Sequence, residues 1–228
     1  NSSIYSTDTN GAGLTVDASD ASWDSGTNSF TWEAWIRTVD KTKTQEIISF
    51  YGSGGGELGE NTLMRIHGSS IKAKIGGQEL VATETINNDT WHHICFERTS
   101  ATQFYLYVDG VGTASSGFSS HSIATNSVTI ANHKVDGGDN TENFDGYIDE
   151  VRISNVARYS GTNFTPSTTA FTSDSDTQLL IHSNESSEST TFTDSSSNAH
   201  TITVAGNIKH QPPVKRIGTS SVYVPNTS

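Results

Sequence analysis

The sequence predicts an all-β protein, a jelly-roll β-sandwich of two antiparallel sheets. Many short segments alternate apolar and polar residues, which is the pattern of a strand with one face against a core. Tight turns rich in Ser, Thr, Gly and Asn separate these segments, and few stretches favour a helix. Hydrophobic residues make up 32% of the 228 residues, which is enough for one sandwich core.

Strands are assigned in chain order wherever the alternation is bounded by turn residues. Before residue 140 they are predicted at residues 2–6, 14–16, 30–37, 45–51, 62–67, 70–75, 78–83, 91–98, 103–108, 111–114 and 127–131. After it they are predicted at residues 147–153, 178–182, 200–205 and 222–224, with one helical turn at 156–159. Gly68-Ser69 and Asp109-Gly110 are the turns that close two of the hairpins.

Two strands carry unusual side chains. Residues 30–37 place Trp32 and Trp35 on opposite faces, which predicts a central strand that is covered on both sides. Simple alternation in residues 147–153 predicts one face with Tyr147, Asp149, Val151 and Ile153 and another with Ile148, Glu150 and Arg152. An acidic pair in such a strand must either be exposed or bind something.

The same alternation predicts which side chains form the core. They are Trp32, Ile36, Ile94, Phe96, Leu106, Val108, Ile130 and Ile148. Cys95 is the single cysteine, so we expect a small buried hydrophobic group and no disulfide within the chain. The formal net charge of -12 argues against nucleic-acid binding, and no apolar run is long enough for membrane insertion.

Three stretches carry a recognisable order of motifs. They are Phe-Thr-Trp-Glu-Ala-Trp-Ile-Arg at residues 30–37, Trp-His-His-Ile-Cys-Phe-Glu-Arg and Tyr-Val-Asp-Gly within residues 91–110, and Asp-Glu-Val-Arg-Ile-Ser-x-x-Ala-Arg-Tyr at residues 149–159. In this order they resemble the laminin-G-like branch of the concanavalin A-like lectin/glucanase superfamily. The resemblance covers most of the chain and implies the jelly-roll sandwich, but a fold does not by itself imply a function.

The position of the last motif suggests how the chain is divided. In the family it lies near the end of the domain, whereas here the chain continues beyond it. We therefore predict a sandwich body at residues 1–165, a linker at 166–177, and strands at 178–228 that resemble the start of a next repeat. Residues 220–223 (Ser-Ser-Val-Tyr) also match residues 2–5 (Ser-Ser-Ile-Tyr), as expected of a tandem repeat.

The strands after residue 177 have two candidate partners. They can fold back onto their own body, which gives a circularly permuted sandwich, or they can complete a neighbouring unit by strand donation. Residues 222–223 and 4–5 would claim the same place in one sandwich. The sequence therefore favours donation, and with it the head-to-tail assembly of copies of the chain.

A calcium site is the cofactor that the resemblance implies. It suggests Asp194 and Asn198 from the Asp-Ser-Ser-x-Asn turn, together with Asp149 from the closing strand, as ligands. The alternative for Asp194 is that its carboxylate caps its own turn by accepting hydrogen bonds from backbone amides.

Candidate glycan-binding residues lie in loops. Trp23 is expected in a turn, where its ring can stack on a sugar. Asp136 and Asp139 lie in a Gly-rich acidic loop that can face a cation or a glycan, or can simply be solvated.

Catalysis is not expected, although the superfamily includes β-glucanases. Glycoside hydrolysis needs two carboxyl groups that flank the bond. Among Asp145, Asp149 and Glu150, the neighbours Asp149 and Glu150 fall on opposite strand faces, and Glu33 stands alone between aromatic residues, so no catalytic residue is assigned. Two function classes remain. One is a structural or adhesive repeat unit of an extracellular fibre, surface protein or virion appendage, and the other is a carbohydrate-binding module.

Overall fold

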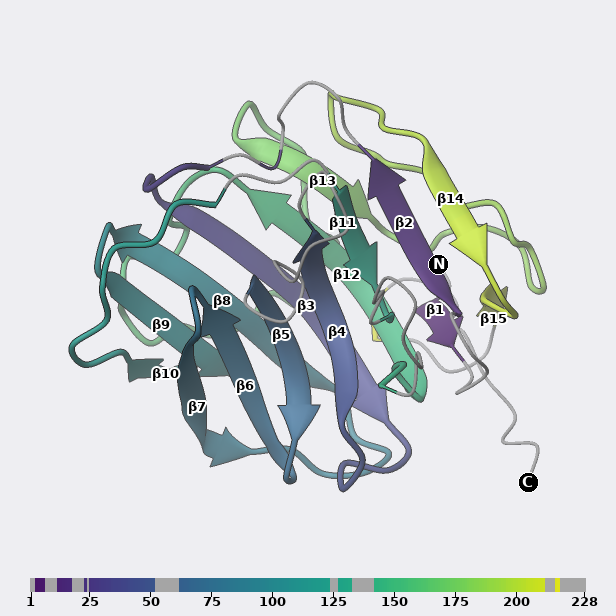
Figure 1. The fold of residues 1–228 in the computed structure, drawn as a ribbon. Coiled ribbons are helices and arrows are strands. Elements are labelled where there is room, and N and C mark those ends of the chain that lie inside the picture. Colours follow the sequence, from purple (N-terminus) through teal and green to yellow (C-terminus); the bar gives the residue numbers. More distant parts are fainter. Residues whose placement is uncertain are drawn as a thin grey trace.

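The computed structural model of the protein describes residues 3–6, 12–17, 23, 25–51, 62–123, 127–132, 142–211 and 216–217. The regular structure of these residues consists of β-strands. Two antiparallel sheets face each other as the layers of a sandwich (Figure 1), which confirms the predicted fold class. The described chain contains no helix with the length and hydrophobicity needed to cross a membrane.

One layer, called sheet A, follows the order β10-β9-β8-β3-β12-β1-β15, and β13 pairs with the second half of β12. Its strands are β1 (Ser3–Ser6), β3 (Phe30–Thr38), β8 (His92–Ser100), β9 (Gln103–Val108), β10 (Val111–Ala114), β12 (Gly146–Ser154), β13 (Thr177–Ile181) and β15 (Lys209–Gln211). The other layer, sheet B, follows the order β14-β2-β11-β4-β5-β6-β7. Its strands are β2 (Gly13–Asp17), β4 (Gln45–Tyr51), β5 (Thr62–His67), β6 (Ser70–Ile75), β7 (Gln78–Thr85), β11 (Ser127–Ile130) and β14 (Ile202–Ala205).

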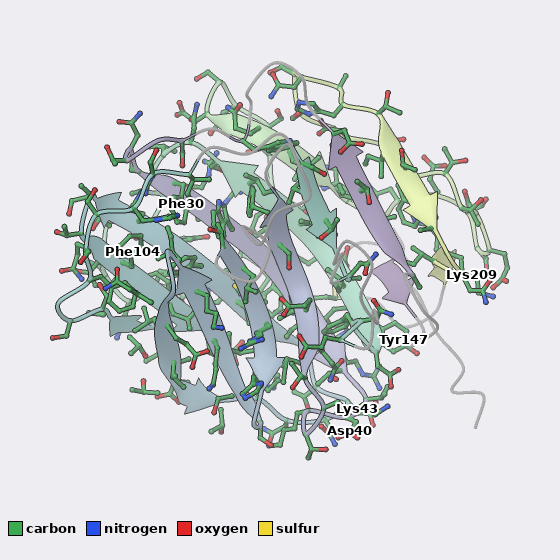
Figure 2. All side chains as sticks on the ribbon, viewed as in Figure 1. Phe30, Asp40, Lys43, Phe104, Tyr147 and Lys209 are labelled. Atoms are coloured by element: carbon green, nitrogen blue, oxygen red, sulfur yellow. The ribbon has the colours of Figure 1, made fainter. Side chains whose placement is uncertain are left out.

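The core fills the space between the two sheets. Each of the eight predicted core residues is at most 2% exposed, so this prediction is confirmed. Phe30 stacks on Trp32 within sheet A, with centroids 4.2 Å apart, and Phe50 of sheet B approaches Trp32 at the same centroid distance. Figure 2 shows Phe30 and Phe104 close together, and their centroids are 6.4 Å apart. Aromatic contacts therefore tie the two layers together.

A β-bulge in β12 changes which of its side chains face the core. The register with β3 shifts between Asp149 and Arg152, so that β12 has one more residue than its partner. Glu150 takes up the extra residue with a positive φ of 50°. As a result Ile148, Val151 and Ile153 all face the core. The predicted face that joined Asp149 to Val151 and Ile153 is therefore wrong, because simple alternation ends at the bulge.

The bulge also marks a change of partner along β12. The first residues of the strand pair with β1, as Ile148 does with Ile4, whereas Val151 and the residues after it pair with β13. Asp149 and Glu150 thus lie at the point where one edge of β12 passes from an N-terminal partner to a C-terminal one.

The C-terminal strands pair within their own chain. β13 pairs with β12, β14 with β2, and β15 with β1, and Figure 1 shows β1, β2, β14 and β15 gathered at one side of the sandwich. This is the fold-back arrangement, not the strand donation that the sequence favours. The predicted strand at 222–224 lies outside the described residues, and β15 was not predicted.

The predicted linker and helical turn also differ from the structure. Residues 156–159 contain no helix. Within the predicted linker at 166–177, Phe171 is buried, and its backbone N–H donates to Glu150 Oε2 over 2.7 Å. Residues 166–177 therefore pack onto the sandwich and do not mark a domain boundary.

Candidate functional site

The outer face of sheet A is covered by residues 155–176, here called the closing segment, which connect β12 to β13. Tyr159 and Phe164 of this segment stack with centroids 3.5 Å apart and planes 4° apart. The Arg152 guanidinium lies 4.1 Å from the centroid of the Phe171 ring. Beneath them, Tyr107 and His93 are fully buried. The closing segment thus turns this face into a second buried layer.

Glu33 is the centre of that layer. Its Oε1 accepts two hydrogen bonds from Arg152, at 2.8 and 2.6 Å, and its Oε2 accepts from the Tyr159 hydroxyl at 2.5 Å and lies 3.1 Å from His93 Nε2. Burial by itself raises the pKa of this carboxyl, but the hydrogen bond to His93 and the charge of Arg152 outweigh burial and lower the pKa to about 2. Glu33 is therefore ionised, satisfied and structural.

Glu97 holds the closing segment in place on sheet A. Its carboxylate accepts hydrogen bonds from the backbone N–H groups of Tyr159 (2.6 Å), Ser160 (3.2 Å) and Gly161 (3.0 Å). The Tyr107 hydroxyl donates a further bond over 3.2 Å. A buried carboxylate with this many donors serves to hold the segment and has little capacity left for a ligand.

The two acids at the β12 bulge are also engaged by neighbouring segments. Glu150 binds the Phe171 amide and lies 3.0 Å from His182 Nδ1. Asp149 is fully buried, and burial, followed by the charge of Glu150, raises its pKa well above the usual range. The backbone amides of Arg216 and Ile217 face Asp149 and oppose this rise, although none has hydrogen-bond geometry to Oδ2.

Asp194 caps its own turn. Its Oδ1 accepts from the Leu180 and Ser196 amides at 3.0 and 2.9 Å. Its Oδ2 accepts from the Ser196 hydroxyl at 2.8 Å and from the His200 amide at 3.0 Å, and lies 2.8 Å from His200 Nδ1. This is the turn-capping alternative, because both oxygens already face hydrogen-bond donors.

The three predicted calcium ligands do not form one donor set. Asn198 lies in the same turn as Asp194, but its side-chain amide donates to the Gln178 carbonyl at 3.1 Å. Asp149 faces residues 216–217 instead. Across the described ranges no group of three or more His, Cys, Asp or Glu residues is placed to hold a metal. Calcium needs six to eight oxygen ligands, and the donors around Asp194 occupy the positions where a cation would bind, so these residues do not fit the ion.

The predicted glycan-binding residues have different outcomes. Trp23 is only 3% exposed, and its ring packs within the core and against His200 at a centroid distance of 4.9 Å. A ring in this position has no open face for a sugar, so Trp23 has a packing role here. Asp136 and Asp139 lie outside the described residues.

The outer face of sheet B carries a group of charged side chains that spans β4 to β7, here called the charged row. Its members are Glu46, Arg65, Lys72 and Glu79, together with Glu142 from the segment before β12. Arg65 is at the centre, with ion pairs to Glu79 (3.5 Å), Glu46 (3.6 Å) and Glu142 (3.7 Å). Lys72 Nζ donates to Glu79 over 2.8 Å.

The charged row is held by longer polar contacts than those that Glu33 makes on sheet A. All three ion pairs of Arg65 are longer than an ordinary hydrogen bond, and its Nε has no partner among the described residues. The side chains of Arg65 and Glu142 are 13% and 31% exposed. Lys72, Glu79 and Glu142 therefore keep part of their side chains at the surface, whereas the unpartnered Nε of Arg65 is buried.

Glu46 is the buried end of the row. Its Oε2 accepts a 3.2 Å hydrogen bond from Ser49, whereas Oε1 has no partner with hydrogen-bond geometry in the described part of the chain. Burial raises the pKa of Glu46 to about 8, against the opposing charge of Arg65, and the neighbouring Glu142 raises it further. The carboxyl is therefore protonated at neutral pH. A buried acid with a displaced pKa beside a polar surface is typical of functional sites.

The sequence contains part of the signal for the charged row. Arg65 lies between the core residues Met64 and Ile66, and Lys72 lies between Ile71 and Ala73, so alternation places both on the outer face. Alternation could not place Glu46 on the outer face, because the register between β4 and β5 shifts directly after this residue.

Comparisons with known proteins agree with this architecture. In the solved structures, the chain resembles a proposed carbohydrate-binding protein from Bacteroides ovatus (16% identity, TM-score 0.58, covering 88% of this chain and 56% of that one). It also resembles the CBM40 of a Ruminococcus gnavus sialidase bound to α2,3-sialyllactose (12% identity, TM-score 0.53, covering 69% and 91%). A third similar structure is the LG4-5 pair of the mouse laminin α1 chain (14% identity, TM-score 0.52, covering 73% and 44%).

These likenesses concern the fold, because every identity is low. The chain spans little more than half the length of the Bacteroides protein. No curated protein matches the sequence significantly. A laminin G family model, however, described as the concanavalin A-like lectin/glucanases superfamily, matches residues 8–162, which is more than half of the chain. The β12 motif and the start of the closing segment lie within this match, and the chain belongs to the laminin-G-like family of the concanavalin A-like superfamily.

Proposed function

We propose that the chain is a non-catalytic carbohydrate-binding unit of an extracellular protein, and that a glycan binds at the charged row of sheet B. The observation that carries this proposal is the contrast between the two outer faces. The face of sheet A is packed beneath the closing segment, whereas the charged row keeps partly exposed donors and acceptors around Arg65, whose ion pairs are long.

The chemistry of the row suits sugar hydroxyls. A hydroxyl both donates and accepts hydrogen bonds, and the row places donors (Arg65, Lys72) beside acceptors (Glu79, Glu142), within about one sugar ring's reach. The net charge of -12 and the carboxylates around Arg65 favour a neutral glycan over an anionic one. The CBM40 domain, which has a similar fold and is bound to α2,3-sialyllactose, supports a glycan as the ligand but not its neutral charge.

A glycan array followed by calorimetry tests the proposal. We expect the native chain to bind at least one neutral oligosaccharide and Arg65→Ala to weaken that binding at least tenfold. Arg37→Ala is the matched control, because Arg37 lies on the outer face of sheet A and is also held by a long ion pair, 3.4 Å from Asp89. Equal loss in both variants, or binding that survives Arg65→Ala, contradicts the assignment of the site.

The second candidate is a structural or adhesive repeat unit, and the match between residues 220–223 and 2–5 favours it. Such a unit belongs in an extracellular fibre, a surface protein or a virion appendage, where copies follow each other along one chain or associate head-to-tail. Sedimentation velocity over a hundredfold range of concentration tests association. Species that grow with concentration support it, and a single monomeric species at every concentration contradicts assembly between separate copies.

A further inference from the structure

β1 fills a place in sheet A that has a strand on either side. Ile4 is opposite Ile148 of β12 and His210 of β15, and Tyr5 is opposite Tyr147 and Lys209. The backbone N–H and C=O of His210 bond to Ser189 and Glu188 on the far edge of β15. Lys209 and Gln211 therefore direct their backbone groups toward β1, because alternate residues of a strand face opposite edges. We call this place between β12 and β15 the β1 slot.

The chain contains a second segment with the sequence of β1. Residues 220–223 read Ser-Ser-Val-Tyr, and residues 2–5 read Ser-Ser-Ile-Tyr. The similarity continues, since Asn226-Thr227 follows one segment as Asp8-Thr9 follows the other. Both segments place a β-branched residue before a tyrosine, which favours an extended strand.

The described residues that precede the second segment in sequence lie near the slot. Arg216 stacks over Trp35 at 3.8 Å, and the backbone of Arg216 and Ile217 faces Asp149. Asp149 directly follows Ile148, the last residue of β12 that pairs with β1. Ser221 is the fourth residue after Ile217, and four extended steps along a chain span about 13 Å. Adjacent strands lie about 4.8 Å apart, so residues 220–223 can reach the slot of their own chain.

We propose that residues 220–223 dock in the β1 slot of their own chain in exchange with β1, in the register that β1 uses. Val222 then takes the place of Ile4 and Tyr223 the place of Tyr5. Two strands of nearly the same sequence make the same backbone bonds to β12 and β15, so neither is strongly favoured. Docking of residues 220–223 releases residues 3–6 from the sheet. The inference is independent of glycan binding, because the slot lies in sheet A and the charged row in sheet B.

Disulfide trapping in the full-length chain tests the exchange. Tyr5 and Lys209 are directly opposite in the structure, and such antiparallel pairs have Cα atoms about 5.5 Å apart, within the range for a disulfide. We compare Tyr5→Cys/Lys209→Cys with Tyr223→Cys/Lys209→Cys under mild oxidation. Ser228→Cys/Lys209→Cys is the control, because residue 228 lies beyond the matched register. Cys95 does not compete, since it is fully buried and burial raises its thiol pKa.

The exchange predicts intramolecular disulfides in both test variants, with yields within about tenfold of each other, and little in the control. Non-reducing electrophoresis and peptide mapping identify the products, and circular dichroism checks that each variant folds. A Tyr223 variant that reacts no more than the Ser228 control overturns the proposal. Products that are exclusively dimeric also overturn it, because the occupant is then another copy.

A second variant keeps the test independent of a cysteine in the tail. Adding Val222→Pro to Tyr5→Cys/Lys209→Cys removes a backbone N–H from the competing segment. We expect the yield of the disulfide between positions 5 and 209 to rise, because β1 then has no competitor. An unchanged yield contradicts the exchange.

Discussion

Glu33 and Glu46 are the same residue type, each buried within a sheet of the sandwich, yet their pKa values move in opposite directions. Glu33 has hydrogen bonds from Arg152 and Tyr159 and a close contact with His93, and its pKa is lowered to about 2. Glu46 accepts a hydrogen bond from Ser49 and lies against a second acid, Glu142, and burial raises its pKa to about 8. The comparison shows that the number and length of the polar contacts, more than burial, decide whether a buried acid is ionised.

The two faces differ in the same way as the two acids. On sheet A the closing segment supplies donors to Glu33, Glu97 and Glu150, so the charges there hold the fold together. On sheet B the charges of the row are held by longer ion pairs and are partly exposed. Satisfied charges stabilise a fold, and incompletely satisfied ones are the groups that a ligand can engage.

The largest expected effect is that of Glu33→Gln. The change leaves the charge of Arg152 without its partner in a buried layer, and breaking a buried ion pair costs about 3–5 kcal/mol of unfolding free energy. Urea unfolding at pH 7 measures the loss. Glu46→Gln is the matched control, and it should be neutral or stabilising at this pH because Glu46 already carries a proton. Equal losses in the two variants contradict the comparison.

The second largest effect should be a difference between Glu33 and Glu46 in how their contributions to stability depend on pH. Glu46 has a raised pKa, so the unfolded chain loses its proton first, and stability falls as pH rises from about 4.5 to about 8. Glu46→Gln removes this fall, and its advantage over the native chain should grow to a few kcal/mol at pH 8, on the order of the shift. Glu33 has a lowered pKa, so its contribution is present above pH 4.5 and is lost as pH falls toward 2. Urea unfolding of the native chain and of each variant across pH measures these differences in unfolding free energy. Differences that do not change over these two opposite pH ranges contradict the assigned pKa directions of Glu33 and Glu46.

A smaller effect is expected from the Asp194 turn. Asp194→Ala removes a cap that bonds three backbone amides and should cost about 1–2 kcal/mol, similar to the loss of a helix cap. Because the carboxylate serves the turn, chelation should leave the melting temperature of the native chain unchanged at matched ionic strength. Thermal unfolding with and without a chelator checks this. A clear drop in the melting temperature on chelation would show that the protein binds calcium after all.

The smallest effect on stability should come from Arg65→Ala. Its ion pairs are long and partly exposed, and such pairs contribute about 0–1 kcal/mol. Urea unfolding should therefore show less than about 1 kcal/mol of loss, while glycan binding falls. A loss comparable to that of Glu33→Gln would mean that the charged row is structural, like the layer on sheet A.

The sequence predicted the layers of the fold but not the exceptions to alternation. Trp32 and Ile148 were placed in the core because a period of two holds in their strands. The face of Asp149 and Val151 was missed because a bulge is a property of strand pairing, and Glu150 carries no mark of its positive φ in the sequence. Trp23 was placed at the surface because a turn residue gives no sign of the core beneath it.

The candidate site depended even more on long-range contacts. Arg65 and Lys72 can be placed on an outer face from alternation, but the ion pair of Arg65 with Glu142, a residue far away in sequence, requires the assembled sandwich. The family motif drew attention to Asp149 and Asp194 instead. Both are acids whose oxygens face backbone amides, a distinction that residue type alone does not reveal.

One measurement tests the contrast between the two faces most directly. Carboxyl carbon shifts of selectively labelled Glu, followed by NMR from pH 2 to pH 9 and assigned with Glu33→Gln and Glu46→Gln, report both acids in one sample. We expect Glu33 to stay ionised down to about pH 2, whereas Glu46 should keep its proton until about pH 8. Two ordinary titrations near pH 4.5 would contradict this expectation.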